Sequence, residues 1–170
     1  MSKVAFITLG CKVNQYETNA MSQEFIEKGY EVVEHNEKAD IYVINTCTVT
    51  NMSDRKSRQM LRRVKELNPN SIVIACGCYV QVAKDEVAKI EDIDLILGNN
   101  EKKNIVEHLE QYQKDKKRQL EIEDLMQQRE FIEFGDVTYT EKTRAVVKIQ
   151  DGCDRFCSYC IIPYARGRVR

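Results

Sequence analysis

Apolar and polar residues along the first 113 positions alternate between two periodicities. Expected strands, most of them short apolar runs, lie at residues 3–9, 30–34, 41–45, 71–75 and 95–97. Expected helices lie at residues 14–28, about 54–67 and 101–113. Strands that alternate with helices predict an α/β fold with a mostly parallel sheet flanked by helices.

The pattern changes after residue 113 and indicates a boundary. Residues 114–140 are first basic and then largely acidic, which is typical of an interdomain linker with some strand or helix character. Residues 143–150 alternate like a new strand, so 141–170 should begin a second domain. The expected organisation is therefore a first domain at 1–113, a linker at 114–140 and the start of another domain at 141–170.

Composition excludes some classes of function. Lys and Arg total 26 and Asp and Glu 27, so no overall positive field marks a nucleic-acid-binding protein, and any RNA contact must come from a local patch. The first apolar run is far shorter than a membrane helix requires, and we expect a cytoplasmic monomer without a membrane partner. Seven cysteines, an odd number, fit metal or redox chemistry better than a disulfide framework.

Three of these cysteines lie on one short loop. Cys153, Cys157 and Cys160 have the spacing C-x3-C-x2-C, so their thiolates can converge on one inorganic centre. Iron-sulfur clusters are normally held by four thiolates, and three would leave one iron open. A structural zinc site needs four ligands, usually in two paired knuckles, and is the weaker alternative. The spacing therefore predicts a four-iron cluster with an open iron.

The loop also has an aromatic residue, Tyr159, directly before its last cysteine. With this residue it resembles the signature of the radical S-adenosylmethionine enzymes. The resemblance implies that the open iron binds S-adenosylmethionine, with Tyr159 at the cofactor site, and that an electron from the cluster generates a radical. The protein would position and shield while the cofactor does the difficult chemistry.

Three more cysteines each follow an expected strand: Cys11, Cys47 and Cys78. In a parallel sheet these strand ends share one edge, where open α/β folds bind ligands. A single free cysteine is more often a small buried apolar residue, but three at equivalent positions are harder to explain in that way. Cys76 lies two residues from Cys78, so either could be the third ligand.

The segments around these cysteines, at 8–18, 43–50 and 77–81, resemble the N-terminal domain of the methylthiotransferases, and residues 161–167 continue the likeness after the radical loop. Within that family the chain most resembles the threonylcarbamoyladenosine tRNA methylthiotransferases. The resemblance implies two [4Fe-4S] clusters: an auxiliary one at Cys11, Cys47 and Cys78, and a radical one at Cys153, Cys157 and Cys160. The family form Gly-Cys-x-x-Gln favours Cys78 over Cys76.

The resemblance further implies the reaction. A methylthio group would be transferred to carbon-2 of N6-threonylcarbamoyladenosine beside the tRNA anticodon, with S-adenosylmethionine as cofactor and flavodoxin or ferredoxin as electron donor. Another tRNA adenosine or a ribosomal protein could be the substrate instead. A non-enzymatic metal-binding module is the alternative from a different class. The barrel and the RNA-binding domain of the family do not follow in this sequence, so we expect the chain alone to be inactive.

Two basic groups are candidate RNA contacts. Arg55, Arg58 and Arg62 fall on one stripe of the expected second helix, and Arg166 and Arg168 follow the radical loop. The stripe is more often a solvated face than a phosphate contact, and the second group has the better claim because it lies beside the radical loop. Asn14 and Asn45, beside the auxiliary cysteines, could support a cluster or simply cap helices and turns.

Overall fold

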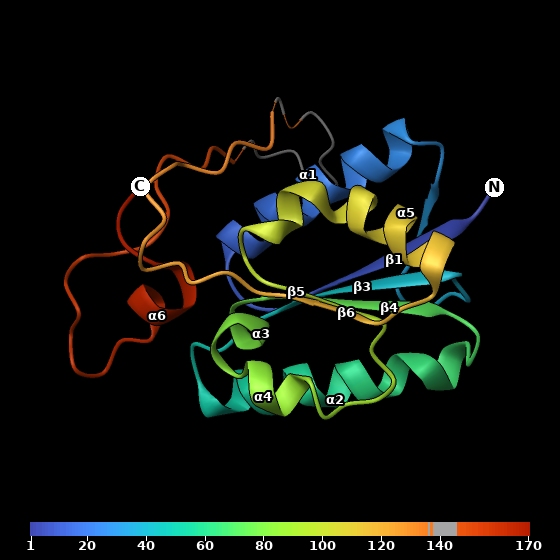
Figure 1. The fold of residues 1–170 in the computed structure, drawn as a ribbon, viewed down its shortest axis with the longest axis horizontal. Coiled ribbons are helices and arrows are strands. Elements are labelled where there is room, and N and C mark those ends of the chain that lie inside the picture. The colour runs from blue at the N-terminus through green and yellow to red at the C-terminus, as the bar shows by residue number, and fades with distance from the viewer. Residues whose placement is uncertain (136, 138–145) are drawn as a thin grey trace.

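The computed structural model describes residues 1–135, 137 and 146–170, and its described part is built around one parallel sheet (Figure 1). The sheet order is β2-β1-β3-β4-β5-β6, and every neighbouring pair is parallel. The strands are β1 (Lys3–Thr8), β2 (Glu31–Val33), β3 (Ile41–Thr46), β4 (Ile72–Gly77), β5 (Leu95–Leu97) and β6 (Gln119–Glu121). The predicted α/β class with a parallel sheet is confirmed.

Helices cover both faces of the sheet. They are α1 (Lys12–Glu27), α2 (Asn51–Leu67), α3 (Cys78–Val82), α4 (Lys84–Val87), the 3-10 helix η1 (Glu101–Asn104), α5 (Ile105–Asp115) and α6 (Ile162–Arg166). Figure 1 shows α1 and α5 over one face and α2, α3 and α4 over the other. The result is three layers with the sheet in the middle.

Each face of the sheet has its own core. Tyr42 and Ile44 of β3 pack with Leu61 of α2, whereas Ile41 and Val43 pack on the opposite face with Phe25 of α1. All six residues of β3 are buried, as expected for a central parallel strand covered on both sides. Because β3 lies between β1 and β4, the loop that follows it lies in the middle of the carboxyl edge of the sheet.

The later part of the chain differs from expectation at one strand. The segment predicted as a linker with some strand or helix character contains the short strand β6, which extends the sheet beyond β5. Of the strand predicted at 143–150, residues 143–145 lie outside the described residues and 146–150 are not a strand. Val147 and Ile149 are 77% and 88% exposed, and the described residues offer no neighbouring strand to take up their backbone hydrogen bonds. The expected start of a second-domain barrel is therefore not seen.

The C-terminal segment nevertheless has a defined base. The amide of Asp151 donates to the carbonyl of Arg170, and the amide of Cys153 donates to the carbonyl of Gly167. Gly152, with φ +72°, lies between them, and a Cβ there would fall 2.1 Å from the carbonyl oxygen of Arg168. Glycine is thus required where the two backbones meet, and the pairing closes the loop that carries the second cysteine trio.

In the part of the chain that the structure describes, no helix combines the length and the apolar character needed to cross a membrane.

Candidate functional site

Three cysteine thiols meet at the carboxyl ends of three neighbouring strands. Cys11 follows β1 and precedes α1, Cys47 follows β3, and Cys78 begins α3 directly after β4. All three line a single cavity of about 150 Å³. The parallel topology therefore brings together the three residues that the sequence placed at equivalent strand ends, whereas their role as ligands stays a prediction.

Buried polar side chains hold the loops that carry these thiols. The Asn14 side-chain amide donates to the carbonyls of Leu9, at 2.7 Å, and Thr46, at 2.9 Å, and so joins the ends of β1 and β3. The Ser57 hydroxyl accepts from the amide of Cys47 and donates to its carbonyl. These hydrogen bonds between protein groups hold the ends of β1 and β3 and the loop at Cys47 in place.

Close packing around the Cys47 thiol also selects a small residue. Gly10 has φ +101°, and a Cβ added there would lie 2.6 Å from the Cys47 Sγ. No larger side chain fits at Gly10 without moving the sulfur of Cys47. Gly10 lies directly before Cys11 in the sequence.

Cys76 and Cys78 lie in different environments. Cys76 is fully buried in the core cluster under α1 and α5, and this burial raises the pKa of its thiol to about 12. Cys78 instead lines the cavity with Cys11 and Cys47. A thiol held protonated in an apolar core is a poor metal ligand, so the placement favours Cys78 as the third cysteine of the trio.

A buried charge network adjoins the cavity. Glu17 of α1 is 1% exposed and pairs with Lys102 at 2.6 Å, with Lys148 at 3.1 Å and with Arg166. Asp151 pairs with Lys148 at 2.7 Å. Burial alone would raise the pKa of Glu17, but the three cations outweigh it and hold that pKa well below its usual value.

Arg166 connects this network to the cysteines. Its Nε donates to the Cys78 Sγ at 3.1 Å, and an η nitrogen donates to the Asn14 Oδ1 at 2.5 Å. The residue is 4% exposed and lines the cavity. This placement corrects the expectation that Arg166 is a surface contact for RNA, because its guanidinium is enclosed by protein groups. Sequence reasoning also missed the ion pair of Glu17 and Lys102: Glu17 lies inside the family-like segment 8–18, but nothing in the sequence marks either residue as part of a charge network.

The remaining basic candidates divide into exposed and partnered side chains. Arg55 and Arg62 are exposed. Arg58 donates to the Tyr79 hydroxyl at 3.1 Å, so the predicted stripe on α2 is partly engaged within the molecule. Arg168 is partly exposed and lies 3.6 Å from Asp154.

The second trio, Cys153, Cys157 and Cys160, lies on the loop before α6. Cys157 is exposed and the other two are half-buried, with a turn in which the Cys160 amide donates to the Cys157 carbonyl at 2.9 Å. Tyr159 is 90% exposed. The structure places these residues on one surface loop, and their assignment to a radical cluster stays a prediction.

No group of three or more His, Cys, Asp or Glu side chains within the described ranges is arranged to hold a metal ion. Thiolates around one zinc ion lie within about 4 Å of each other, because each Zn–S bond is about 2.3 Å. A four-iron cluster is several bonds across and holds its thiolates further apart. The first trio shares one cavity, and the group that it binds stays a prediction.

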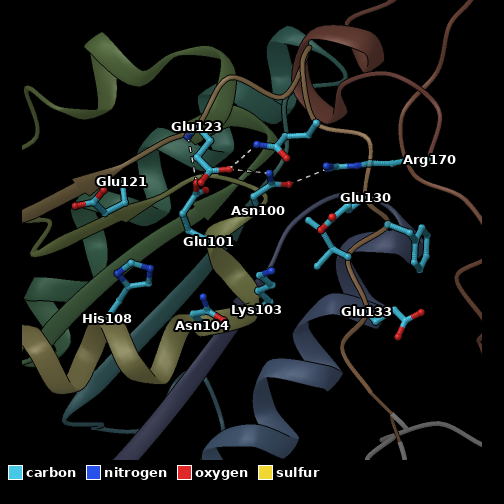
Figure 2. Close-up of a pocket in the computed structure, with 13 residues that line it drawn as sticks. Asn100, Glu101, Lys103, Asn104, His108, Glu121, Glu123, Glu130, Glu133 and Arg170 are labelled. Carbon is cyan, nitrogen blue, oxygen red and sulfur yellow. Dashed lines mark hydrogen bonds between the residues drawn. The ribbon is translucent and has the colours of Figure 1, made fainter.

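A larger cavity, of about 600 Å³, lies away from the cysteines. Figure 2 shows it between α5 and the segment that leads away from β6, lined by five glutamates: Glu101, Glu121, Glu123, Glu130 and Glu133. On one side Arg170 donates to the Asn100 Oδ1 at 2.9 Å, and Asn100 donates to Glu123. The acidic lining does not suit an RNA phosphate, and the Arg170 contact helps to dock the C-terminal segment on the sheet domain.

Comparison with known proteins places these features in a family. Residues 3–98 match the family model described as uncharacterized protein family UPF0004. The chain is 46% identical to the threonylcarbamoyladenosine tRNA methylthiotransferase MtaB of Aquifex aeolicus, across 99% of this chain and 41% of that protein. It is 44% identical to MtaB of Bacillus subtilis, across 100% of this chain and 38% of that protein.

A methylthiotransferase named for a different substrate also matches. The ribosomal protein uS12 methylthiotransferase RimO of Desulfitobacterium hafniense is 37% identical, across 99% of this chain and 38% of that protein. The chain thus spans about two fifths of the length of these relatives.

Proposed function

The chain belongs to the protein family UPF0004, and on that premise we propose that it is the cluster-binding N-terminal part of a tRNA methylthiotransferase. The substrate we propose is N6-threonylcarbamoyladenosine beside the anticodon, modified at carbon-2 in the cytoplasm. Support for this substrate comes from the higher identity to the two MtaB proteins than to the RimO protein. Because the chain covers about two fifths of these relatives, the whole reaction is part of the proposal.

One observation carries the proposal: three thiols from three adjacent strands line one cavity. Cys11, Cys47 and Cys78 would hold a four-iron cluster there and leave one iron for an external group. Cys153, Cys157 and Cys160 would hold a second cluster, with Tyr159 at the S-adenosylmethionine site. When bound, the two clusters and S-adenosylmethionine supply the sulfur and the radical that the insertion requires.

The chain's own residues prepare the first site. Asn14 and Ser57 hold the two loops through hydrogen bonds to the backbone, which would reduce the ordering cost of cluster assembly. Val13 and Ile162 give the cavity an apolar lining beside the thiols. Exposed basic side chains, among them Arg55, Arg62 and Arg168, remain the proposed contacts for tRNA phosphates.

Reconstitution tests the two sites. After anaerobic incubation with iron and sulfide, we expect about eight irons per chain and an absorbance band from sulfur-to-iron charge transfer. Replacing either cysteine trio by alanine should leave about four irons. A chain that binds one zinc tightly and takes up no iron would instead support the non-enzymatic metal-binding module.

A chimera tests the reaction. This chain would replace the corresponding part of the Bacillus subtilis relative, with which it aligns over its whole length. In cells without the native enzyme, the chimera should restore 2-methylthio modification of threonylcarbamoyladenosine in tRNA, measured by nucleoside mass spectrometry. The same chimera with Cys47→Ala is the matched control. Methylthiolation of a ribosomal protein without tRNA modification would contradict the proposed substrate.

A further inference from the structure

The guanidinium of Arg166 lies between the first cysteine trio and the buried carboxylate of Glu17. Its Nε donates to the Cys78 Sγ at 3.1 Å, while its two η nitrogens donate to Glu17. The side-chain amide of Asn99 approaches the same sulfur at 3.8 Å and donates to the carbonyl of Ala165 at 2.5 Å. Cys78 is thus contacted by a charged donor from a segment 88 residues later in the chain.

The carboxylate of Glu17 fixes the orientation of the Arg166 guanidinium. Both Glu17 oxygens accept from it, and a two-point contact between arginine and a carboxylate sets the plane of the guanidinium. Glu17 is in turn held by Lys102 and Lys148. With the η nitrogens engaged, the Nε–H direction toward Cys78 is determined. Lysine could not reproduce this arrangement, because its single ammonium lacks separate donors in fixed directions.

The charges around the sulfur are unequal. The buried network contains three cations, Lys102, Lys148 and Arg166, and two carboxylates, Glu17 and Asp151. Arg166 is the member of the network that contacts the Cys78 sulfur, so its positive charge lies closest to that sulfur. A deprotonated sulfur, or a more negative group attached to it, balances this positive charge.

We infer that Arg166 is a positioning residue of the first cysteine site: its hydrogen bond and charge hold the Cys78 sulfur and favour the more negative, reduced state of a cluster bound there. The inference rests on the proposed function, since it concerns the auxiliary cluster. Hydrogen bonds to ligand sulfurs and nearby positive charge raise the reduction potential of iron-sulfur clusters. Arg166 follows the second cysteine trio by six residues, so the segment that carries one site sets the electronic properties of the other.

The test measures a potential and not an activity. A chain with Cys153→Ala, Cys157→Ala and Cys160→Ala should load the first site alone, and its reduction potential can be followed by paramagnetic resonance during redox titration. Adding Arg166→Gln should shift the reduction equilibrium about tenfold toward the oxidised cluster, as expected when a hydrogen bond to a charged partner is lost. For a one-electron couple this is a fall of about 59 mV.

Two further variants distinguish the loss of the hydrogen bond to the Cys78 sulfur from the loss of a positive charge elsewhere or a loss of folding. Arg168→Gln removes a partly exposed arginine two residues later, which makes no contact with Cys78 in the described structure, and should leave the potential unchanged. Arg166→Lys keeps a cation for Glu17 and so protects the fold, but it loses the fixed Nε donor and should lower the potential by part of the same amount. Circular dichroism melting of each variant shows whether it is folded before titration.

The outcomes distinguish the inference from the proposed function. If the chain with Arg166 intact takes up no iron at its first trio, the proposed function fails and the inference fails with it. If it loads about four irons, but both Arg166 variants titrate like Arg168→Gln, the proposed function stands and the inference is overturned. A lowered potential confined to the Arg166 variants supports both.

Discussion

A Glu17→Gln substitution removes a negative charge that three buried cations share. Glu17 is 1% exposed and Lys102 is 0% exposed, with their charged atoms 2.6 Å apart, so water cannot replace the lost partner. Among the described residues, Lys102 forms no other ion pair. Breaking a buried pair by removing one member costs about 3–5 kcal/mol, and we expect the free energy of unfolding to fall by this amount.

Urea unfolding at pH 7, followed by circular dichroism of the metal-free chain, measures the change. The matched control is Glu27→Gln, the same chemical change at an exposed position of α1, where about 0.5 kcal/mol or less is expected. A Glu17→Gln variant within about 1 kcal/mol of this control would refute the view that the network is a buried, mutually dependent unit.

The same residue predicts a dependence on pH. The folded chain holds the pKa of Glu17 well below the ordinary value of 4.5, so its ionised form is favoured by folding. The resulting stabilisation is complete above pH 4.5 and is lost as the pH falls below it. The native chain should therefore lose stability more steeply in acid than Glu17→Gln, and parallel curves would contradict the assignment.

Three further predictions concern single positions. Gly77→Ala should cost about 3 kcal/mol and Gly29→Ala about 1 kcal/mol in urea unfolding: both have positive φ, but only at Gly77 would the Cβ meet a backbone oxygen, at 2.5 Å. Cys78→Ala should remove about half of the reconstituted iron, whereas Cys76→Ala should leave the iron and cost about 1 kcal/mol of stability. Glu24→Gln should stabilise the chain at pH 8 and change little at pH 4, because burial raises the pKa of Glu24 to about 7.

For each of these three predictions, a specific experimental result would contradict it. Equal costs at the two glycines would show that crowding at Gly77 is relieved by movement of the backbone. Loss of iron from Cys76→Ala, with iron retained by Cys78→Ala, would reverse the choice between the two cysteines. An equal effect of Glu24→Gln at both pH values would mean that its carboxylate is not held neutral by the fold.

One physical reason made both the sheet and the proximity of Cys11, Cys47 and Cys78 predictable from the sequence. Parallel strands end at the same edge, so residues within three positions of Thr8, Thr46 and Gly77 had to come close once those strands were recognised. Strand β6 could not be recognised in this way. Its three residues, Gln119–Glu121, are half-buried or exposed at the edge of the sheet and lack an apolar run.

The burial of Arg166 was also beyond sequence reasoning, for a different reason. Its partner Glu17 lies 149 residues earlier, and neither residue has a spacing or composition that links it to the other. A run of arginines near a predicted site indicates a surface patch more often than an internal ion pair. For the expected strand at 143–150, the alternation was present in the sequence, but its described residues find no strand to pair with.

Residues from two separate parts of the chain build the first cysteine site. The family match covers residues 3–98 and contains the three thiols, but the residues that enclose them lie partly beyond it. Gln150, Asp151 and Ile162 line the cavity, and Arg166 contacts the Cys78 sulfur. Because that arginine is balanced by Glu17 inside the matched range, neither part of the chain satisfies its buried charges alone. The smallest unit that can present this site as the structure shows it therefore runs from β1 to the end of α6.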